Sequence, residues 1–356
     1  MTLAAEHAYL NTRVSVMATR LLEPTAIGPL SRLPLSDLAE RFRLSAILDE
    51  QHSARARSRA VEQSLIQVLL AELLILVRPM HTAERRLVLD WGGKYALFNL
   101  KTLIRGKLHN LDQKEIRDNL FELPEQMRLS EQVSADLFRA ENVLELLRQL
   151  EAGAHRTIAR QAREIYEQQR EPFELEAAID QRYYAGLIRQ AMAFTDHHLD
   201  PLKRLIGAEL DRINLLWLLR FRFSYMLSPS ETFYHLVPSM RLLTRDRLLQ
   251  LVNLESFQGV IDALPPPLDQ LLADSRNIVD VQKRIGRYAA GEAYRVLHRT
   301  QSAVARALAY LILRERDLLF LFALAQGQIL NLPAAAIEIA VELAEPGCHW
   351  AGTQAA

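Results

Sequence analysis

Apolar residues recur at gaps of three and four along most of the chain. One such set comprises Val133, Leu137, Ala140, Leu144 and Leu147, and another comprises Val304, Leu308, Leu311, Leu318 and Phe322. This period matches the 3.6 residues of a helical turn, so each set lies along one side of an amphipathic helix. Glycine is sparse, and prolines fall in short segments at 22–35, 171–172, 200–201 and 265–267, where we expect helices to begin or end. The pattern predicts an all-α fold.

Two copies of one pattern lie in the first two thirds of the chain. Residues 99–107 and 214–222 share the spacing N-L-x-x-L-x-R-x-(K/R), which pairs Asn99 with Asn214 and Arg105 with Arg220. A capping box follows each copy, with Asp112 and Glu115 in the first and with Ser228, Pro229 and Glu231 in the second. A helix, a short turn and a second capped helix are therefore repeated.

A weaker third copy lies near the C-terminus. Gly327, Asn331, Leu332 and Ile337 repeat the spacing of Gly106, Asn110, Leu111 and Ile116. Phe320 stands where the first copy has Asn99, Gln326 replaces Arg105, and Pro333 marks the start of the next helix. We expect three related helical units at residues 1–130, 131–245 and 246–356, the last one degenerate and ending in a tail.

The repeated polar residues Asn99, Arg105, Asn214 and Arg220, together with Asp211, are the candidate functional residues. Asn and Arg are six positions apart in each helix, so they project from different faces and do not form a single site. Either they face a central cavity or a partner, or they tie their helix to the neighbouring unit. Asp211, whose counterpart in the first copy is Ala96, is expected to be a charge on the helix surface.

Charge and cysteine content narrow the class of protein. Lys and Arg number 43, as do Asp and Glu, so the chain has no net charge to attract nucleic acid. The single cysteine, Cys348, excludes an internal disulfide and any multi-thiolate metal site, and it fits a reducing compartment. We see no unbroken apolar stretch of roughly 18 to 20 residues and no export signal, so a membrane would be met from the cytoplasmic side through a partner.

Motifs for chemistry are not apparent. The segment 196–200 (Asp-His-His-Leu-Asp) lacks a zinc-binding spacing, and we favour a solvated helix end before Pro201 over a metal site there. Gly92-Gly93-Lys94 lacks the spacing of a phosphate-binding loop and predicts a turn. Arg55, Arg57 and Arg59 could touch lipid head groups or an acidic partner, but a solvated helix start is favoured. We expect no catalytic residue, no cofactor, no metal and no small-molecule substrate.

Several segments resemble the family of C-type subunits, also called d-type, of the V-type and A-type rotary ATPases. The resemblance rests on residues 9–14 (Tyr-Leu-Asn-Thr-Arg-Val), 99–108, 207–220 and 225–229, and it extends over roughly residues 8 to 340. These motifs are structural, so the specificity of the match comes from their order, their spacing and the total length.

The resemblance implies a fold and a role. Members of the family form an all-α funnel of three similar helical units around a pseudo-threefold axis. Such a protein lies on the cytoplasmic face of the membrane, contacts the proteolipid rotor ring, and receives the central shaft subunits (D/F-type) in its cavity. It has no chemistry of its own and passes torque between the ATP-processing head and ion movement through the ring. For this role we expect a polar, charge-lined cavity for the shaft and an apolar and basic rim for the ring.

Two alternatives belong to other classes of protein. A soluble all-α helical-repeat scaffold would bind a protein partner in its concavity and would not purify with membranes. An all-α enzyme with an apolar cavity would require a cluster of magnesium-binding carboxylates, such as D-D-x-x-D, which this sequence lacks. The rotor subunit is therefore the leading hypothesis.

Overall fold

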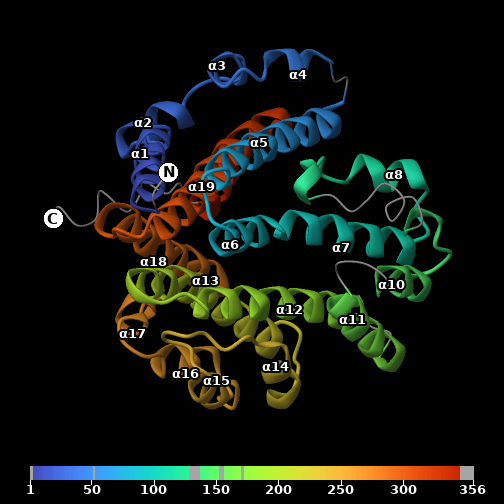
Figure 1. The fold of residues 1–356 in the computed structure, drawn as a ribbon. Coiled ribbons are helices and arrows are strands. Elements are labelled where there is room, and N and C mark those ends of the chain that lie inside the picture. The colour runs from blue at the N-terminus through green and yellow to red at the C-terminus, as the bar shows by residue number, and fades with distance from the viewer. Residues whose placement is uncertain (1–2, 51–52, 128–136, 152–155, 170–171, 345–356) are drawn as a thin grey trace. The chain divides into compact units, whose positions relative to one another are not determined.

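The computed structural model describes residues 3–50, 53–127, 137–151, 156–169 and 172–344 (Figure 1). Within these ranges every regular element is a helix, which confirms the predicted all-α class. Val133, Glu171, Cys348 and the tail from Glu345 lie outside the described residues.

The helices follow one another along the whole chain. The first half contains α1 (Leu3–Ala18), α2 (Pro24–Ser31), α3 (Leu35–Arg41), α4 (Ser45–Glu50), α5 (Ala54–Val77), α6 (Thr82–Gly92), α7 (Lys94–Leu108), α8 (Gln113–Asp118), the 3-10 turn η1 (Glu125–Met127), α10 (Val143–Glu151) and α11 (Arg156–Gln169). The second half contains α12 (Pro172–Met192), α13 (Asp196–Phe223), α14 (Pro229–His235), α15 (Arg245–Val252), α16 (Phe257–Asp262), α17 (Leu268–Leu272), α18 (Ile278–Arg299), α19 (Ala303–Ile329) and α20 (Ala334–Ala344).

These helices form two compact units, which are described separately. The larger unit contains residues 1–85 and 191–356, and the smaller unit contains residues 86–190. This division into two units follows from how the helices pack. The three units at 1–130, 131–245 and 246–356 are defined by the repeated sequence pattern, and they remain a prediction.

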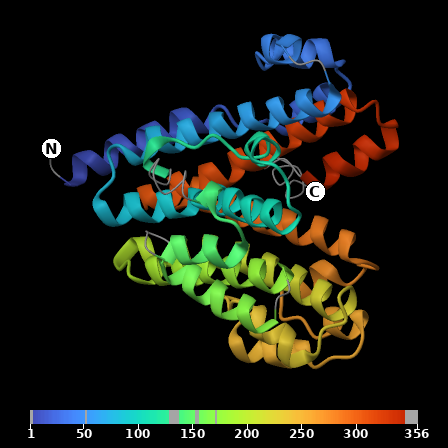
Figure 2. The same ribbon diagram turned by 90° about the vertical axis from the view of Figure 1, so that its right-hand side faces the viewer.

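Helix α19 is the central helix of the larger unit. It packs against α1, α5, α13, α18 and α20, and both views show it running alongside α5 (Figures 1 and 2). Of the residues that the sequence places on one face, Val304, Leu308, Leu311 and Leu318 are buried, and Phe322 is half-buried. Tyr310 and Phe320 are fully buried as well, as expected of a helix that neighbours surround on several sides.

One described helix, α5, is long and apolar enough to cross a bilayer by length and composition. Its residue Glu72 is buried and accepts hydrogen bonds from Tyr310 (2.6 Å) and Arg314 (3.2 Å) of α19. Arg20 donates a third bond to the same carboxylate at 3.0 Å. A carboxylate held by two guanidinium groups and a phenol is typical of a protein interior, so α5 is the first core helix of the larger unit.

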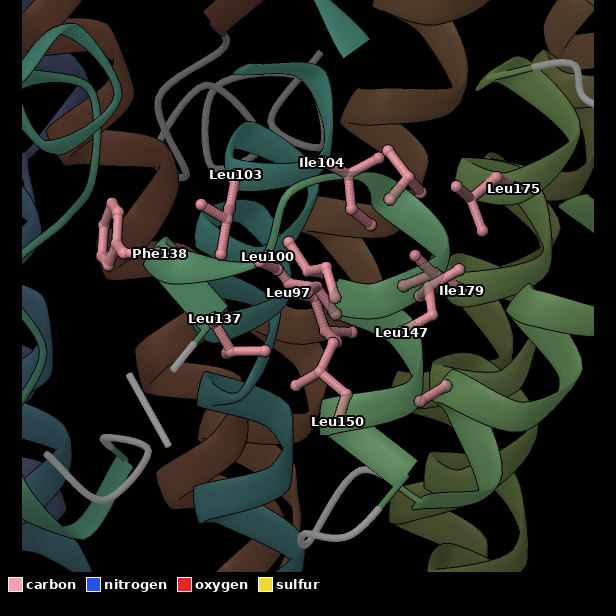
Figure 3. Close-up of a cluster of buried hydrophobic side chains, with 14 of the residues drawn as sticks. Leu97, Leu100, Leu103, Ile104, Leu137, Phe138, Leu147, Leu150, Leu175 and Ile179 are labelled. Atoms are coloured by element: carbon pink, nitrogen blue, oxygen red, sulfur yellow. The ribbon is translucent and has the colours of Figure 1, made fainter. Parts of the chain in front are cut away.

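The smaller unit has its own hydrophobic core, formed by α7, α10 and α12 (Figure 3). Leu100 and Ile104 of α7 lie beside Leu147 of α10 and Ile179 of α12. The apolar face predicted over 133–147 is interrupted before α10, because Asn142 accepts a hydrogen bond from the Glu145 amide at 3.0 Å and starts the helix there.

Three pairs of long helices follow one another in sequence. We call α5, α12 and α18 the leading helices, and α7, α13 and α19 the following helices. Helix α6 and a turn at Gly93 precede α7, as the Gly-Gly pair predicts. Pro201 was expected at a helix boundary but lies in the second turn of α13, which begins at Asp196. Pro201 therefore lies inside the helix, where it cannot donate the backbone hydrogen bond that another residue would give to the carbonyl four positions earlier.

Each following helix contacts the leading helix of the next pair. Within the smaller unit, Lys101 of α7 forms an ion pair with Asp180 of α12 at 2.8 Å. Within the larger unit, α13 packs against α18, and α19 packs against α5. The last following helix therefore contacts the first leading helix.

Candidate functional site

The repeated asparagines hold the backbone of the segment that follows their helix. Asn99 donates to the carbonyl of Phe121 at 2.8 Å and accepts from its amide at 2.7 Å. Asn214 makes the same pair of bonds with Val237, at 2.6 and 3.0 Å, and is fully buried. An amide side chain matches a backbone peptide group in both donor and acceptor, so each asparagine acts as a bidentate clamp. Phe320, the counterpart in the third copy, removes this clamp from α19.

The repeated arginines project from another face, as their spacing predicts, and contact the next leading helix. Arg105 donates two hydrogen bonds to Glu176 of α12, and these bonds raise the pKa of the guanidinium. Arg220 donates to Gln282 of α18 at 3.1 Å. Both acceptors occupy the fifth position of their leading helix.

The third copy keeps this contact without its charge. Gln326, which replaces the arginine, donates to Ser58 at 3.2 Å, and Ser58 is again the fifth residue of its leading helix, α5. The contact therefore has the same register in all three copies, although its chemistry passes from an ion pair to a bond between neutral groups.

A further position, two residues beyond the arginine, also repeats. Lys107 donates to the carbonyl of Phe138 at 2.6 Å, and Arg222 donates to that of Val252 at 2.9 Å. In the third copy, Gln328 donates to the carbonyl of Leu33 at 2.7 Å. The residue at the last position of the repeated pattern therefore donates a hydrogen bond to a distant backbone carbonyl in each copy. This residue is charged in the first two copies and is the neutral Gln328 in the third.

Asp211 is not the surface charge that the sequence favours. It is fully buried, and its carboxylate accepts a hydrogen bond from the amide of Leu243 at 2.8 Å. Burial raises the pKa of this carboxyl to about 6, although Ser239, the Leu243 amide and Arg241 act in the opposite direction. The burial arises because residues 239–243 fold over α13, which the local sequence of the helix does not reveal.

A counterpart of Asp211 lies on α19. Asp317 occupies the same position relative to Phe320 as Asp211 does relative to Asn214, is also fully buried, and accepts from the amide of Leu22 at 2.8 Å. Sequence comparison of the first and third copies misses this residue, because Ala96 stands at that position in the first copy. Aligning the second and third copies would have found it.

Each following helix ends in a turn with a positive-φ residue. Asn110, Met226 and Asn331 have φ angles of 52°, 58° and 51°. In the first and third copies the next residue, Leu111 or Leu332, donates its amide at 2.9 Å to the carbonyl five residues earlier, which is the Schellman arrangement of a helix end. The second turn is one residue longer, and Leu227 donates at 2.9 Å to the carbonyl of Phe221, six residues earlier. The predicted capping boxes of Asp112 with Glu115 and of Ser228 with Glu231 are both confirmed immediately afterwards.

Two carboxylates, the half-buried Glu209 and the buried Glu292, link elements of the larger unit where the sequence offered no repeated signal. Glu209 of α13 binds Arg316 of α19 at 3.0 Å and Arg212 at 2.9 Å. Burial opposes ionisation of Glu209, but the two arginines outweigh it and lower its pKa to about 2. Glu292 of α18 is buried and lies 3.1 Å from Arg241. Each of the two carboxylates therefore pairs with an arginine of another element.

The basic run at the start of α5 has two exposed arginines and a third, Arg59, that is half-buried. Ser53 caps the helix by accepting from the amide of Ala56 at 3.1 Å, Arg55 and Arg57 are exposed, and Arg59 forms an ion pair with Glu62. The run lies in the first turns of a helix, as the sequence predicts.

The five candidate residues are therefore engaged within the chain. Asn214 and Asp211 are brought together, because they hold the two ends of one segment, Val237 and Leu243. Asn99 and Arg105 share α7 but reach different elements. Contact of any of them with a partner stays a prediction.

Comparison with known proteins agrees with this architecture. The sequence profile of the family described as "ATP synthase (C/AC39) subunit" matches residues 10–339. The C subunit of the A-type ATP synthase of Methanocaldococcus jannaschii is 22% identical over 341 residues, covering 92% of this chain and 84% of the archaeal protein. The matched region runs from α1 to α20 and includes all three copies of the repeated pattern. The chain therefore belongs to the ATP synthase C/AC39 subunit family.

Proposed function

We propose that this protein is the non-catalytic central-stalk subunit of a V/A-type ATPase or ATP synthase. It links the central shaft to the membrane proteolipid ring and transmits torque for ATP-coupled proton or sodium transport. The observation that carries the proposal is the threefold repetition of one contact, from a following helix to the fifth residue of the next leading helix. The family assignment supplies the complex in which such a subunit acts.

The contact pattern favours a closed arrangement of three units. Arg105 reaches α12, Arg220 reaches α18, and Gln326 returns to α5 at the beginning of the chain. An open solenoid leaves its first and last repeats without such a contact and covers them with caps. A closed arrangement distributes shear over three equivalent contacts, which suits a part that must turn without deforming.

The ends of the following helices are suited to bind a partner. Exposed apolar side chains gather in the turns after these helices: Leu111, Tyr225, Met226, Leu330 and Leu332. Each of the three copies contributes at least one residue to this set. We assign these turns to the rim that faces the proteolipid ring, on the cytoplasmic face of the membrane, and the interior to the shaft subunits.

The direct test is native mass spectrometry of the chain, affinity-purified from gently solubilised membranes of its own host. We expect one copy of the chain with a proteolipid ring and a coiled-coil shaft protein. Recovery only from the soluble fraction, with no ring, would reject the proposal and favour the helical scaffold.

A further inference from the structure

Three histidines from distant parts of the sequence form a cluster in the larger unit. His7 of α1 lies beside His197 and His198, and one ligand nitrogen from each ring falls within 4.8 Å of the others. The rings of His7 and His198 meet edge to face at 5.6 Å between centroids. The sequence favours a solvated helix end for this segment. The structure instead makes it the first turn of α13 and adds a third imidazole that sequence spacing could not supply.

The His7 ring has an unsatisfied atom. Its Nε2 is buried and makes no hydrogen bond, although Oε1 of Glu84 lies 3.4 Å away. Glu84 is itself buried, and its other oxygen accepts from the amide of His81 at 3.1 Å. A buried nitrogen without a hydrogen bond is unfavourable, and a buried carboxylate requires positive charge nearby. A cation between the imidazoles would satisfy both groups.

The His198 ring is oriented by a second group. Its Nδ1 lies 2.8 Å from the hydroxyl of Ser302, which is fully buried at the start of α19. Metal-binding histidines typically use one ring nitrogen for such an outer contact, which fixes the ring and leaves the other nitrogen for the metal. His197 is exposed, so the cluster is reachable from solvent.

We propose that His7, His197 and His198 bind one divalent transition-metal ion of the zinc class. Imidazole nitrogens are preferred ligands for such ions, and three of them leave a fourth position for water. The ion would pin α1 to the start of α13, beside the residues that begin α19. This proposal is independent of the proposed rotor function, because it rests on side chains that the repeated contacts do not use.

The test uses the tag-free full-length chain, stripped of metal with a chelator and titrated with Zn²⁺ alone by calorimetry. We expect one Zn²⁺ per chain, and at least ~10-fold weaker binding in His197→Gln, because each lost ligand costs no less than an outer-shell change. His197 is exposed, so its replacement leaves the core intact. His109→Gln, an exposed histidine of the smaller unit, is the matched control and should bind as tightly as the wild type.

A second readout follows the ligands directly. Co²⁺ in place of Zn²⁺ should give visible absorption bands in the wild type that weaken in both His7→Gln and His197→Gln, with circular dichroism verifying that both variants are folded. The proposal is overturned if the wild type binds no Zn²⁺, or if both variants bind Zn²⁺ with unchanged affinity.

Discussion

At the scale of single residues, the chain uses polar side chains as substitutes for backbone partners. Asn99 and Asn214 each take the place of a peptide group in hydrogen bonding. Asp211 and Asp317 each accept a hydrogen bond from the backbone amide of a residue that is distant in sequence. The asparagines satisfy a donor and an acceptor together and remain neutral. Each aspartate satisfies one donor only. For Asp211, whose pKa is raised by burial, the contribution to stability depends on pH.

Asp211→Asn should remove a pH-dependent cost to stability. The folded-state pKa of Asp211, about 6, is above the ordinary value of 3.8, so the folded protein holds this proton more tightly than the unfolded chain does. Stability is therefore lost as the pH rises from about 4 to 6, by up to ~3 kcal/mol. An asparagine keeps the acceptor for the Leu243 amide without the charge. We expect its advantage in urea midpoint over the wild type to be largest at pH 7.5 and to shrink towards pH 4.

Asp274→Asn is the control for this measurement, because Asp274 is exposed on the same unit. It should leave the pH profile of the urea midpoint unchanged. A wild-type profile that is flat between pH 4 and 6, or one that Asp211→Asn does not alter, would contradict the burial argument.

At the scale of elements, the packing of each following helix on the short helix after it depends on paired residue sizes. Gly106 and Gly327 lie directly against Ile116 and Ile337, and a Cβ added to Gly327 would lie 2.6 Å from Cγ1 of Ile337. The second copy has Phe221 and Thr232 at the equivalent positions, both buried. In the first and third copies the following helix has the small residue and the short helix after it has the large one. In the second copy these sizes are reversed, which keeps the combined side-chain volume similar.

Gly106→Ala should therefore destabilise the protein despite the helix propensity of alanine. The new methyl group overlaps the buried Ile116 side chain, and overpacking of this kind costs about 1–3 kcal/mol. Gly28→Ala in α2 is the matched control. No atom lies within 4 Å of its new Cβ, so we expect a neutral or stabilising effect.

A double-mutant cycle with Ile116→Ala identifies the cause. The double variant should be less destabilised in thermal unfolding than the sum of the two single variants, because the smaller side chain relieves the overlap. Additive losses would show that the glycine is needed for another reason.

The sequence predicts local features of these elements better than it predicts their contacts. The capping boxes at Asp112 and Ser228 could be found because their partners lie three residues away. The equivalence of Asn99 and Asn214 could be found because the residue type is retained. The position of Gln326 could be aligned with that of Arg105, but the contacts of Gln326 and Gln328 could not be predicted, because their residue type changed while the contacts stayed. Asp211 was misplaced, because its burial depends on a segment about thirty residues further along.

At the scale of the whole molecule, the three following helices expose apolar side chains at equivalent ends. Met226 is the most exposed of them, at 78% of its surface, and it occupies a positive-φ position. Met226, with the exposed Tyr225 beside it in sequence, is therefore the site at which the proposed rim is best tested.

Met226→Asp should weaken binding to ring-containing membranes from which the native protein has been stripped. Aspartate tolerates positive φ, so the turn is preserved while the apolar contact is replaced by a charge. We expect at least a ~10-fold loss of affinity in a cosedimentation assay with an unchanged melting temperature, since one buried methionine side chain corresponds to about 1.5–3 kcal/mol. Leu249→Asp, at an exposed site on α15, should bind as the wild type does. Equal binding by Met226→Asp and the wild type would remove this turn from the proposed rim.

The contact between Gln326 and Ser58 spans 268 residues, which has a consequence during synthesis. At 5–20 residues per second, α5 leaves the ribosome roughly 13–54 s before the helix that covers it. For that time a helix apolar enough to cross a bilayer lacks its main packing partner, and Glu72 lacks both Tyr310 and Arg314. The nascent chain therefore presents a membrane-like segment long before it can bury it.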